Sequence, residues 1–299
     1  MATEVVSALS VKPGGRHIDG TAGGGGHAAS ILAASAPNGW LFGCDRDGAA
    51  VEAARERLAE FAGRFDIQRG NFAELLETLT PGWDGVLLDL GTSSPQLDTA
   101  QRGFSFQQDG PLDMRMDTRQ SLTAAELVST LDADELARIF WELGGERQSR
   151  RFARAIEHDR RERPFTSTGQ LAGLIERLAP RQGKRTHPAT QVFQALRLAV
   201  NDELGSLRRG LAEAVKLLKP GGRLAVITFH SLEDRVVKEF GREHAREYEY
   251  EGPVDVPELR RPRAPELKWV GRKALKPGAA ELAENPRSRS AQLRVMEKI

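Results

Sequence analysis

The stretch best suited to bind a ligand runs from His17 to His27. A short apolar segment ends in Asp19, and four consecutive glycines, residues 23–26, lead into an alanine-rich segment. This pattern predicts a strand, a tight turn and a helix start, because glycine fits where the backbone turns sharply or lies against a ligand. The free N–H groups at the helix start can bind a polar or anionic ligand. The alternative is a glycine turn that binds nothing.

A carboxylate follows at the end of the next predicted strand, residues 40–44. Asp45 lies 25 residues after Gly20, where a nucleotide bound on the glycine loop would present its ribose hydroxyls. A carboxylate can accept hydrogen bonds from both hydroxyls. The alternative for Asp45 is the N-cap of the following helix. Because Asp47 is better placed for that capping role, the spacing favours Asp45 as a ligand-binding residue.

A second polar loop, residues 91–98, follows the apolar segment 83–90, which predicts a buried strand ending in Asp89. Ser94 and Pro95 match half of the S/D/N-P-P-aromatic loop of methyltransferases that act on exocyclic amines of bases, whereas Gln96 and Leu97 depart from it. The serine hydroxyl and the carbonyl before a rigid proline could hold the N–H groups of such an amine. The alternative is a simple turn, which Ser-Pro favours.

A third feature is a basic segment. Residues 147–163 contain seven arginines against three acids, and Lys184 to His187 add further positive charge. Helical spacing places four of the arginines on one face, where they could hold the phosphates of a nucleic acid; these are Arg147, Arg150, Arg151 and Arg154. Phe152 and Ile156 mark a different, apolar face for packing. The alternative is a solvated helix face, or pairing of these arginines with Glu157 and Asp159.

The elements that must position these residues alternate between strand and helix. Strands are predicted at residues 16–19, 40–44, 65–68 and 83–90, with helices at 27–34 and from Asp47 or Gly48 to Leu58. The alternation stops near Gln101. Helices are then predicted at 123–129, 132–143, 147–161 and 167–179, followed by one long helix at 189–218. Two further strands, at 224–229 and 291–296, flank a helix at 233–246, and residues 248–286 are expected to be irregular.

This order of elements predicts an α/β fold, a Rossmann-like sheet with an inserted helical domain. The expected division is residues 1–100 and 191–299 for the cofactor-binding sheet domain and residues 101–190 for the helical substrate-recognition domain. Ligands of such sheets bind at the carboxyl ends of the strands, where the glycine loop, Asp45 and the Ser94 loop all fall.

The composition of the 299-residue chain is ordinary for a globular protein, with 39% hydrophobic residues, 28% charged residues and a net charge of +1. The one cysteine, Cys44, excludes an internal disulfide and a cysteine-rich zinc site, and no metal is expected. The sequence contains no apolar run long enough for a membrane span and no signal-peptide pattern. We therefore expect a cytoplasmic protein without membrane partners.

Several stretches together resemble one family. The glycine loop with Asp19, Gly23 and Gly25 resembles motif I of the class I S-adenosylmethionine methyltransferases, with Thr21 in place of the first glycine. The segments 88–98 and 229–235 are more distinctive: DLGxSSPQLD and FHSLEDR. Over nearly the whole chain the sequence resembles the bacterial small-subunit ribosomal RNA methyltransferase H family, also called MraW.

The resemblance implies methylation of the exocyclic N4 amine of a cytidine in the decoding region of 16S ribosomal RNA, with S-adenosylmethionine as methyl donor. It implies small-subunit RNA as partner, within an assembled or assembling subunit, and leaves a homodimer open. Carried over residue by residue, it implies a cofactor site formed by Gly25, Gly26, His27, Asp45, Phe72, Asp89 and Gln96. Phe72 could equally be a core residue.

One departure from the family lies at the N-terminus. The family has a His-x-Pro-Val segment before the first helix, near the cofactor pocket, whereas this sequence starts Met1-Ala2-Thr3-Glu4. We expect either a misassigned start codon or a more open pocket.

Direct in-line transfer is the expected mechanism, because the methyl sulfonium is already activated and the enzyme supplies orientation and desolvation. The amine must lose a proton, for which Asp89, Ser94 and Asp113 are the candidate catalytic residues. Two other functions remain open. The first is a nucleotide- or RNA-binding assembly module without turnover, and the second is a nicotinamide dehydrogenase of the same fold. The dehydrogenase would need a clear G-x-G-x-x-G loop.

Overall fold

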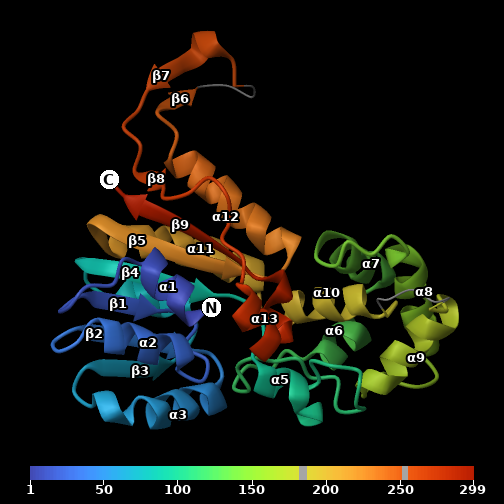
Figure 1. The fold of residues 1–299 in the computed structure, drawn as a ribbon. Helices are drawn as coiled ribbons and strands as arrows, with labels where there is room; N and C mark the ends of the chain where they lie inside the picture. Colours follow the sequence, from blue (N-terminus) through green and yellow to red (C-terminus); the bar gives the residue numbers. More distant parts are fainter. Residues whose placement is uncertain (182–186, 251–254) are drawn as a thin grey trace. The chain divides into compact units, whose positions relative to one another are not determined.

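A computed structural model describes residues 1–181, 187–250 and 255–299 of the chain (Figure 1). Lys184 to Thr186 of the predicted basic segment lie outside the described residues. The chain divides into two compact units, one formed by Met1–Gly91 and Leu204–Ile299 and the other by Thr92–Glu203. We expected the divisions nearer to residues 100 and 191. The roles assigned to the two units, cofactor binding and substrate recognition, remain predictions.

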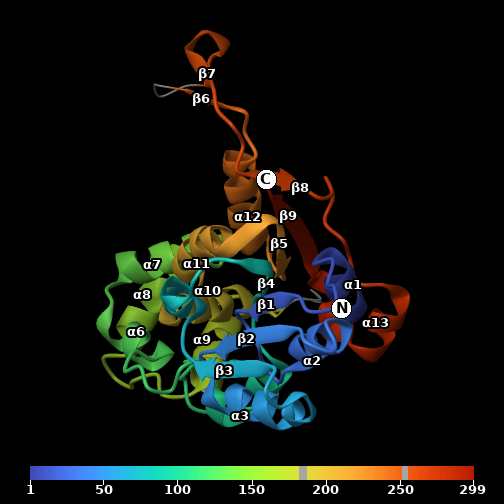
Figure 2. The same cartoon turned by 90° about the vertical axis from the view of Figure 1, so that its left-hand side faces the viewer.

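The first unit contains a seven-stranded sheet in the order β3-β2-β1-β4-β5-β9-β8 (Figures 1 and 2). Its parallel part consists of β1 (Arg16–Asp19), β2 (Trp40–Asp45), β3 (Phe65–Arg69), β4 (Trp83–Asp89) and β5 (Leu218–Thr228). The last two strands, β9 (Gln292–Lys298) and β8 (Leu267–Trp269), run antiparallel to their neighbours. From β1 the chain adds β2 and β3 on one side of the sheet and β4 and β5 on the other. Ligands of such sheets bind at the carboxyl ends of the two strands where this change of side occurs, here β1 and β4.

Helices cover both faces of this sheet, as its apolar strands require. One core contains apolar residues of α1 (Ala2–Ala8), α2 (Gly26–Ala34) and α3 (Gly48–Arg57). The opposite core contains residues of α4 (Phe72–Leu75), α11 (Glu203–Leu217) and α12 (Ser231–His244). In β4, Val86 and Leu88 face one core and Leu87 the other, because side chains alternate along a strand. The α/β fold class predicted from the sequence is confirmed.

Two predicted boundaries of this unit were wrong. The long helix expected at 189–218 is two helices, α10 (Thr190–Val200) and α11, separated at Asp202, whose φ is +44°. The fifth strand, expected to begin at residue 224, begins at Leu218 instead. There, Leu218 pairs with Trp83 but Arg223 pairs with Gly85, so residues 219–222 form a bulge. Gly221, with φ of +78°, provides the left-handed position in this bulge.

The region expected to be irregular, residues 248–286, also contains regular elements. A small ribbon of β6 (Tyr248–Tyr250) and β7 (Arg260–Pro262) projects from the sheet (Figures 1 and 2). The strand β8 and the helix α13 (Ala279–Glu284) follow. These elements are short and rich in charged residues, so periodicity alone does not identify them.

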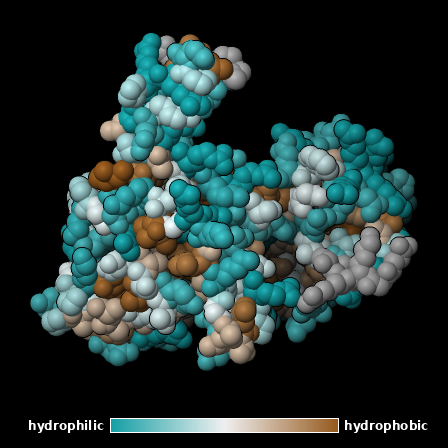
Figure 3. All heavy atoms as spheres, turned by 45° about the horizontal axis from the view of Figure 1, so that its top comes forward, coloured by the Kyte–Doolittle hydropathy of each residue, from teal (hydrophilic) through white to brown (hydrophobic). Residues whose placement is uncertain are grey.

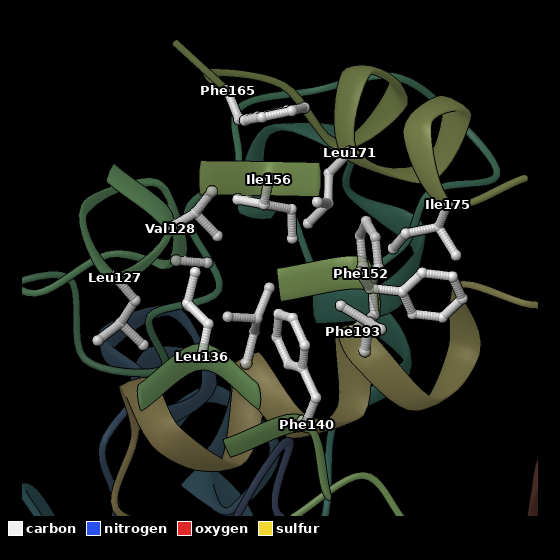
Figure 4. Close-up of a cluster of buried hydrophobic side chains, with 14 of the residues drawn as sticks. Leu127, Val128, Leu136, Phe140, Phe152, Ile156, Phe165, Leu171, Ile175 and Phe193 are labelled. Atoms are coloured by element: carbon white, nitrogen blue, oxygen red, sulfur yellow. The ribbon is translucent and has the colours of Figure 1, made fainter. Parts of the chain in front are cut away.

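The second unit is helical and has its own core. It contains α5 (Ser94–Asp98), α6 (Ala124–Thr130), α7 (Ala133–Glu142), α8 (Ser149–Asp159), α9 (Thr168–Leu178) and α10. Leu136, Phe140, Phe152, Ile156 and Phe193 meet in the core that these helices enclose (Figure 4). None of its described residues belongs to the seven-stranded sheet. Capping boxes at Asp132 and Ser167 begin α7 and α9, and Thr123 caps α6.

The surface is ordinary for a globular protein. Figure 3 shows hydrophilic residues over most of the visible face, with apolar residues in small separate groups. Within the described ranges, no helix combines the length and the apolar character that crossing a membrane requires.

Candidate functional site

The glycine loop joins β1 to α2 at the carboxyl edge of the sheet. Gly25 is the N-cap of α2 with φ of +77°, and a Cβ on it would lie 3.1 Å from the Cα of Ala54 in α3. Gly25 therefore allows α2 to pack closely against α3. A Cβ on Gly24, in contrast, would meet nothing within 4 Å. The backbone at Gly24 thus faces open space, as a ligand cradle requires.

The residue that replaces the first motif glycine, Thr21, has a structural role. Its hydroxyl oxygen accepts a hydrogen bond of 2.6 Å from the backbone N–H of Asp89. This bond ties the loop after β1 to the end of β4. Gly20 beside it permits close packing, because a Cβ there would lie 2.6 Å from Cδ2 of Leu88. No local sequence pattern indicates that Thr21 holds Asp89 in place.

Asp45 lies at the end of β2 and supports the glycine loop. Its Oδ2 accepts a hydrogen bond of 2.9 Å from the N–H of Gly23, and its Oδ1 accepts one of 2.9 Å from the N–H of Asp47. Burial raises the pKa of Asp45 although these hydrogen bonds oppose the shift. Asp47, as expected, is the N-cap of α3 and accepts from Ala49. Because a carboxylate oxygen can accept two hydrogen bonds, Asp45 keeps acceptor capacity for ligand hydroxyls.

Three further polar residues lie together at this edge of the sheet. Nε2 of His27, in the first turn of α2, is 3.3 Å from Oδ2 of Asp89. Burial opposes protonation of His27, but the hydrogen bond and charge of Asp89, together with the charge of Asp19, outweigh it and raise the pKa of His27. Burial raises the pKa of Asp19 to about 7. Asp19 matched the acidic position of motif I, yet its burial was not foreseen.

Each of these three side chains carries a buried polar atom without a hydrogen-bond partner in the described structure. These atoms are Oδ2 of Asp19, Nδ1 of His27 and Oδ1 of Asp89. Buried polar groups are almost always paired, so unpaired ones in a cluster indicate a missing ligand. The acceptors and the open glycine backbone fit S-adenosylmethionine, which presents two cationic groups and two ribose hydroxyls.

The other proposed cofactor residue of this unit, Phe72, is 7% exposed and belongs to the core. A Cβ on Gly210 would lie 2.1 Å from Cε2 of the Phe72 ring, so α11 packs directly on that ring. The packing therefore favours the core alternative that the sequence left open. A contact between Phe72 and the cofactor remains a prediction.

In the helical unit, Ser93 is the N-cap of α5 and forms a capping box with Gln96. The Oε1 of Gln96 accepts a hydrogen bond of 3.0 Å from the N–H of Ser93, and Gln96 is 5% exposed. Gln96 thus stabilises the start of the helix, and its proposed cofactor contact is a further, untested role. Ser94 is exposed, so its hydroxyl is accessible to a substrate.

Asp113, a candidate proton acceptor, is held by Arg115. The two side chains form a fork, with Nε to Oδ1 at 2.8 Å and Nη2 to Oδ2 at 2.7 Å. Partial burial opposes ionisation of Asp113, but the hydrogen bonds from Arg115 outweigh it and lower the pKa of the carboxyl. A carboxylate stabilised in this way is a weak base.

Three of the four candidate RNA-binding arginines lie on α8, which begins at Ser149. Arg147 precedes the helix, so its expected place on the helical face was wrong. All four still line one surface groove together with α7. Phe152 and Ile156 are buried on the other face, as predicted (Figure 4). Glu157 accepts from the N–H of Ala133, and Asp159 pairs with Arg177. The expected alternative, pairing of these acids with the four arginines, is therefore wrong.

Comparison with known proteins completes this picture. The model of the MraW methylase family matches residues 1–299. The chain belongs to the MraW methylase family. Among its relatives is the ribosomal RNA small subunit methyltransferase H of Syntrophotalea carbinolica, 51% identical over 100% of this chain and 96% of the relative. The protein of the same name from Geobacter sulfurreducens is 52% identical over 100% of this chain and 97% of the relative.

Membership of the MraW methylase family confirms the resemblance described for the sequence. It also agrees with the expected methyl donor, S-adenosylmethionine. A solved structure of an rRNA methylase from Streptococcus thermophilus is similar at a TM-score of 0.44 and 9% identity, covering 100% of this chain and 93% of that one. In the described residues, no group of three or more His, Cys, Asp or Glu side chains is placed to hold a metal ion.

Proposed function

We propose that this protein methylates the exocyclic N4 amine of a cytidine in the decoding region of 16S ribosomal RNA. The observation that carries the proposal is the match to the MraW methylase family over the whole chain, with relatives named ribosomal RNA small subunit methyltransferase H. The unpaired buried carboxylate oxygens of Asp19 and Asp89 beside the glycine loop support it. The partner is small-subunit RNA, in an assembled or assembling subunit, and a homodimer remains open.

S-adenosylmethionine, when bound, supplies a methyl group already activated by its sulfonium. Asp45 would accept from the ribose hydroxyls, and Gly24 leaves the backbone open toward the ligand. Gly25 and Gly26, at the start of α2, are assigned to the same site by the family resemblance. The carboxylates of Asp19 and Asp89 offset its positive charge, while His27 orients Asp89 through the contact at 3.3 Å. Phe72 and Gln96 are assigned to the same cofactor site by the family resemblance alone.

The target amine needs acceptors for its N–H groups, because its lone pair is delocalised into the cytosine ring. The exposed hydroxyl of Ser94 is suited to this task. The carbonyl before Pro95 lies in the first turn of α5 and is assigned to the same task from the sequence pattern alone. By accepting hydrogen bonds from the two N–H groups, they orient the amine so that its lone pair points at the methyl group. This role requires correct geometry and not a strong base. Asp89 has an unpaired buried Oδ1 and is the better proton acceptor, whereas Asp113 is committed to Arg115.

The RNA must be held while one base leaves its stack. We assign that grip to the four arginines of the α7–α8 groove, Arg147, Arg150, Arg151 and Arg154, acting on phosphates. Their exposure and their lack of carboxylate partners among the described residues support this assignment.

Binding titrations separate this function from its alternatives. S-adenosylmethionine and NAD are titrated against the purified chain, and transfer of a labelled methyl group to small ribosomal subunits is then measured. We expect binding of S-adenosylmethionine, no binding of NAD and incorporation that Asp45→Ala reduces at low cofactor concentration. Binding without incorporation on naked RNA, free subunits and assembling particles would instead support the assembly-module function.

A further inference from the structure

One exposed aromatic side chain has no role in the function described so far. Trp141, near the end of α7, is 58% exposed and is the sole aromatic among the large hydrophobic residues exposed in the described structure. An exposed tryptophan does not contribute the large free energy that burial of its ring would add to folding. Exposed aromatic side chains commonly take part in binding. Leu136 and Phe140, on the same helix, are fully buried. Trp141 therefore does not belong to the core-facing side of α7.

Trp141 lines the surface groove of about 1050 Å³ that contains the four arginines. A fifth arginine, Arg138 of α7, lines it one turn before Trp141, and a single carboxylate, Asp134, completes the charged lining. All of these residues come from α7, from α8 or from the segment between them. The groove is therefore defined within the helical unit.

The charges of the groove oppose the local stability of the helix. Arg150 and Arg151 occupy the first turn of α8, which contains no acidic residue and has no side-chain cap. Cations are unfavourable there, because the N–H ends of the helix already carry partial positive charge. Of the five arginines, only Arg151 has a side-chain partner among the described residues, the amide of Gln148 at 2.9 Å. Such local conflicts are expected where function requires them.

We propose that this groove binds an unpaired nucleotide of the RNA substrate, with its base stacked on Trp141 and its phosphates held by the surrounding arginines. The proposal rests on the proposed function, because that function makes RNA the partner. It adds that the RNA is single-stranded at this point. The groove contains none of the residues assigned to the methyl donor.

The chemistry favours a single strand over a duplex or a protein. Base stacking on an aromatic ring requires a base whose face is free, which paired RNA does not offer. An apolar peptide segment would offer no negative charges to the five arginines of the groove. The phosphates of a nucleic-acid backbone offer a repeated series of them. Stacking is tolerant of sequence, so this groove adds affinity rather than identity.

The test uses the full chain and two probes, a short single-stranded oligoribonucleotide and the same strand annealed to its complement. Trp141→Leu keeps an apolar side chain but removes the aromatic face, and Trp141→Phe retains a smaller one. We expect Trp141→Leu to weaken binding of the single strand about tenfold and Trp141→Phe to weaken it less. The salt dependence should stay unchanged in both variants, because stacking releases no counterions.

The control is Ile299→Ala, which removes an apolar side chain of similar exposure, 57%. Tryptophan fluorescence provides a second measurement, since the single strand should quench the parent protein more than Trp141→Phe. Unchanged binding of the single strand by Trp141→Leu, or an equal loss for strand and duplex, would overturn the proposal. Neither result would touch methyl transfer itself, which is measured separately on small ribosomal subunits and decides the proposed function.

Discussion

Nε2 of His27 and Oδ2 of Asp89 are 3.3 Å apart, although His27 begins a helix and Asp89 ends a strand separated from it by two strands along the chain. The contact links the two loops that the sequence marked as chemically active. Oδ2 contacts His27, whereas Oδ1 has no partner among the described residues and keeps its full acceptor capacity for a ligand or a proton. The geometry thus assigns different tasks to the two oxygens of one carboxylate.

Asp45→Ala should weaken binding of S-adenosylmethionine by roughly 1.5–3 kcal/mol, the usual loss for hydrogen bonds to a charged acceptor. Isothermal calorimetry measures it. The matched control is Asp47→Ala, two residues on, which removes the N-cap of α3. That variant should lower the free energy of unfolding by about 1 kcal/mol and leave the affinity for cofactor nearly intact. Unchanged cofactor affinity in a folded Asp45→Ala would refute the ribose assignment.

Gly24→Ala should reduce cofactor affinity while leaving thermal stability unchanged, because the added methyl enters open space where the ligand would lie. Gly20→Ala is the counterpart. Its Cβ would lie 2.6 Å from Leu88, so the loss should appear in the free energy of unfolding. A Gly24→Ala protein that binds S-adenosylmethionine like the parent would show that the ligand does not approach this backbone.

The raised pKa of Asp19, about 7 against an ordinary 3.8, predicts a dependence on pH. Between these two values the folded protein holds a proton that the unfolded chain has released. The free energy of unfolding therefore falls as the pH rises through that window. Asp19→Asn should reduce this slope and leave the part that comes from the raised pKa values of Asp45 and His27, as denaturant unfolding at a series of pH values would reveal.

The same titration should act on the cofactor. S-adenosylmethionine carries a net positive charge, so its affinity should rise as Asp19 ionises near pH 7. Loss of the proton from His27 would act in the same direction. Asp19→Asn should flatten the profile, and an unaltered pH profile in this variant would exclude Asp19 as the titrating group.

Ser94→Ala should slow methyl transfer while leaving the affinity for S-adenosylmethionine nearly unchanged, because the lost hydroxyl contacts the target base. Ser93→Ala is the neighbouring control, since it breaks the capping box of α5 and should act on stability. Single-turnover rates with saturating cofactor make the comparison. If Ser94→Ala transfers at the parental rate, another group orients the amine.

Replacing Arg147, Arg150, Arg151 and Arg154 by glutamine should greatly weaken RNA binding and leave cofactor affinity as it was. Each phosphate contact contributes about 0.7 to the slope of log affinity against log salt on a single strand, so the slope should fall by roughly 3. Arg55→Gln and Arg177→Gln, which change exposed, paired arginines, serve as controls. RNA methylation at the parental rate by the fourfold variant would show that these arginines do not bind the RNA.

The sheet and the place of the site were predictable because they depend on local patterns. Apolar runs such as residues 83–90 are buried on both faces, and such runs followed by an acid identify strands and their carboxyl ends. The position of Asp47 at the start of a periodic segment likewise predicted that it caps α3. Asp45 was therefore not needed as the cap and could be assigned to a ligand.

What the sequence missed depends on contacts between distant segments. The hydrogen bond from Asp89 to Thr21 spans 68 residues, and no local pattern encodes it. The break at Asp202 interrupts an otherwise continuous helical pattern without glycine or proline. Arg147 lies before α8, which begins at Ser149. Its N-cap, Gln148, makes no side-chain capping hydrogen bond, so no capping pattern marks this boundary in the sequence.

The most direct test of the account is the identity of the methylated nucleoside. Small ribosomal subunits that lack the modification are incubated with the purified protein and S-adenosylmethionine, and the 16S RNA is digested to nucleosides for mass spectrometry. We predict N4-methylcytidine, derived from the decoding region and formed more slowly at low S-adenosylmethionine when Asp45→Ala replaces the parent. A methyl group on any other atom or base would contradict it.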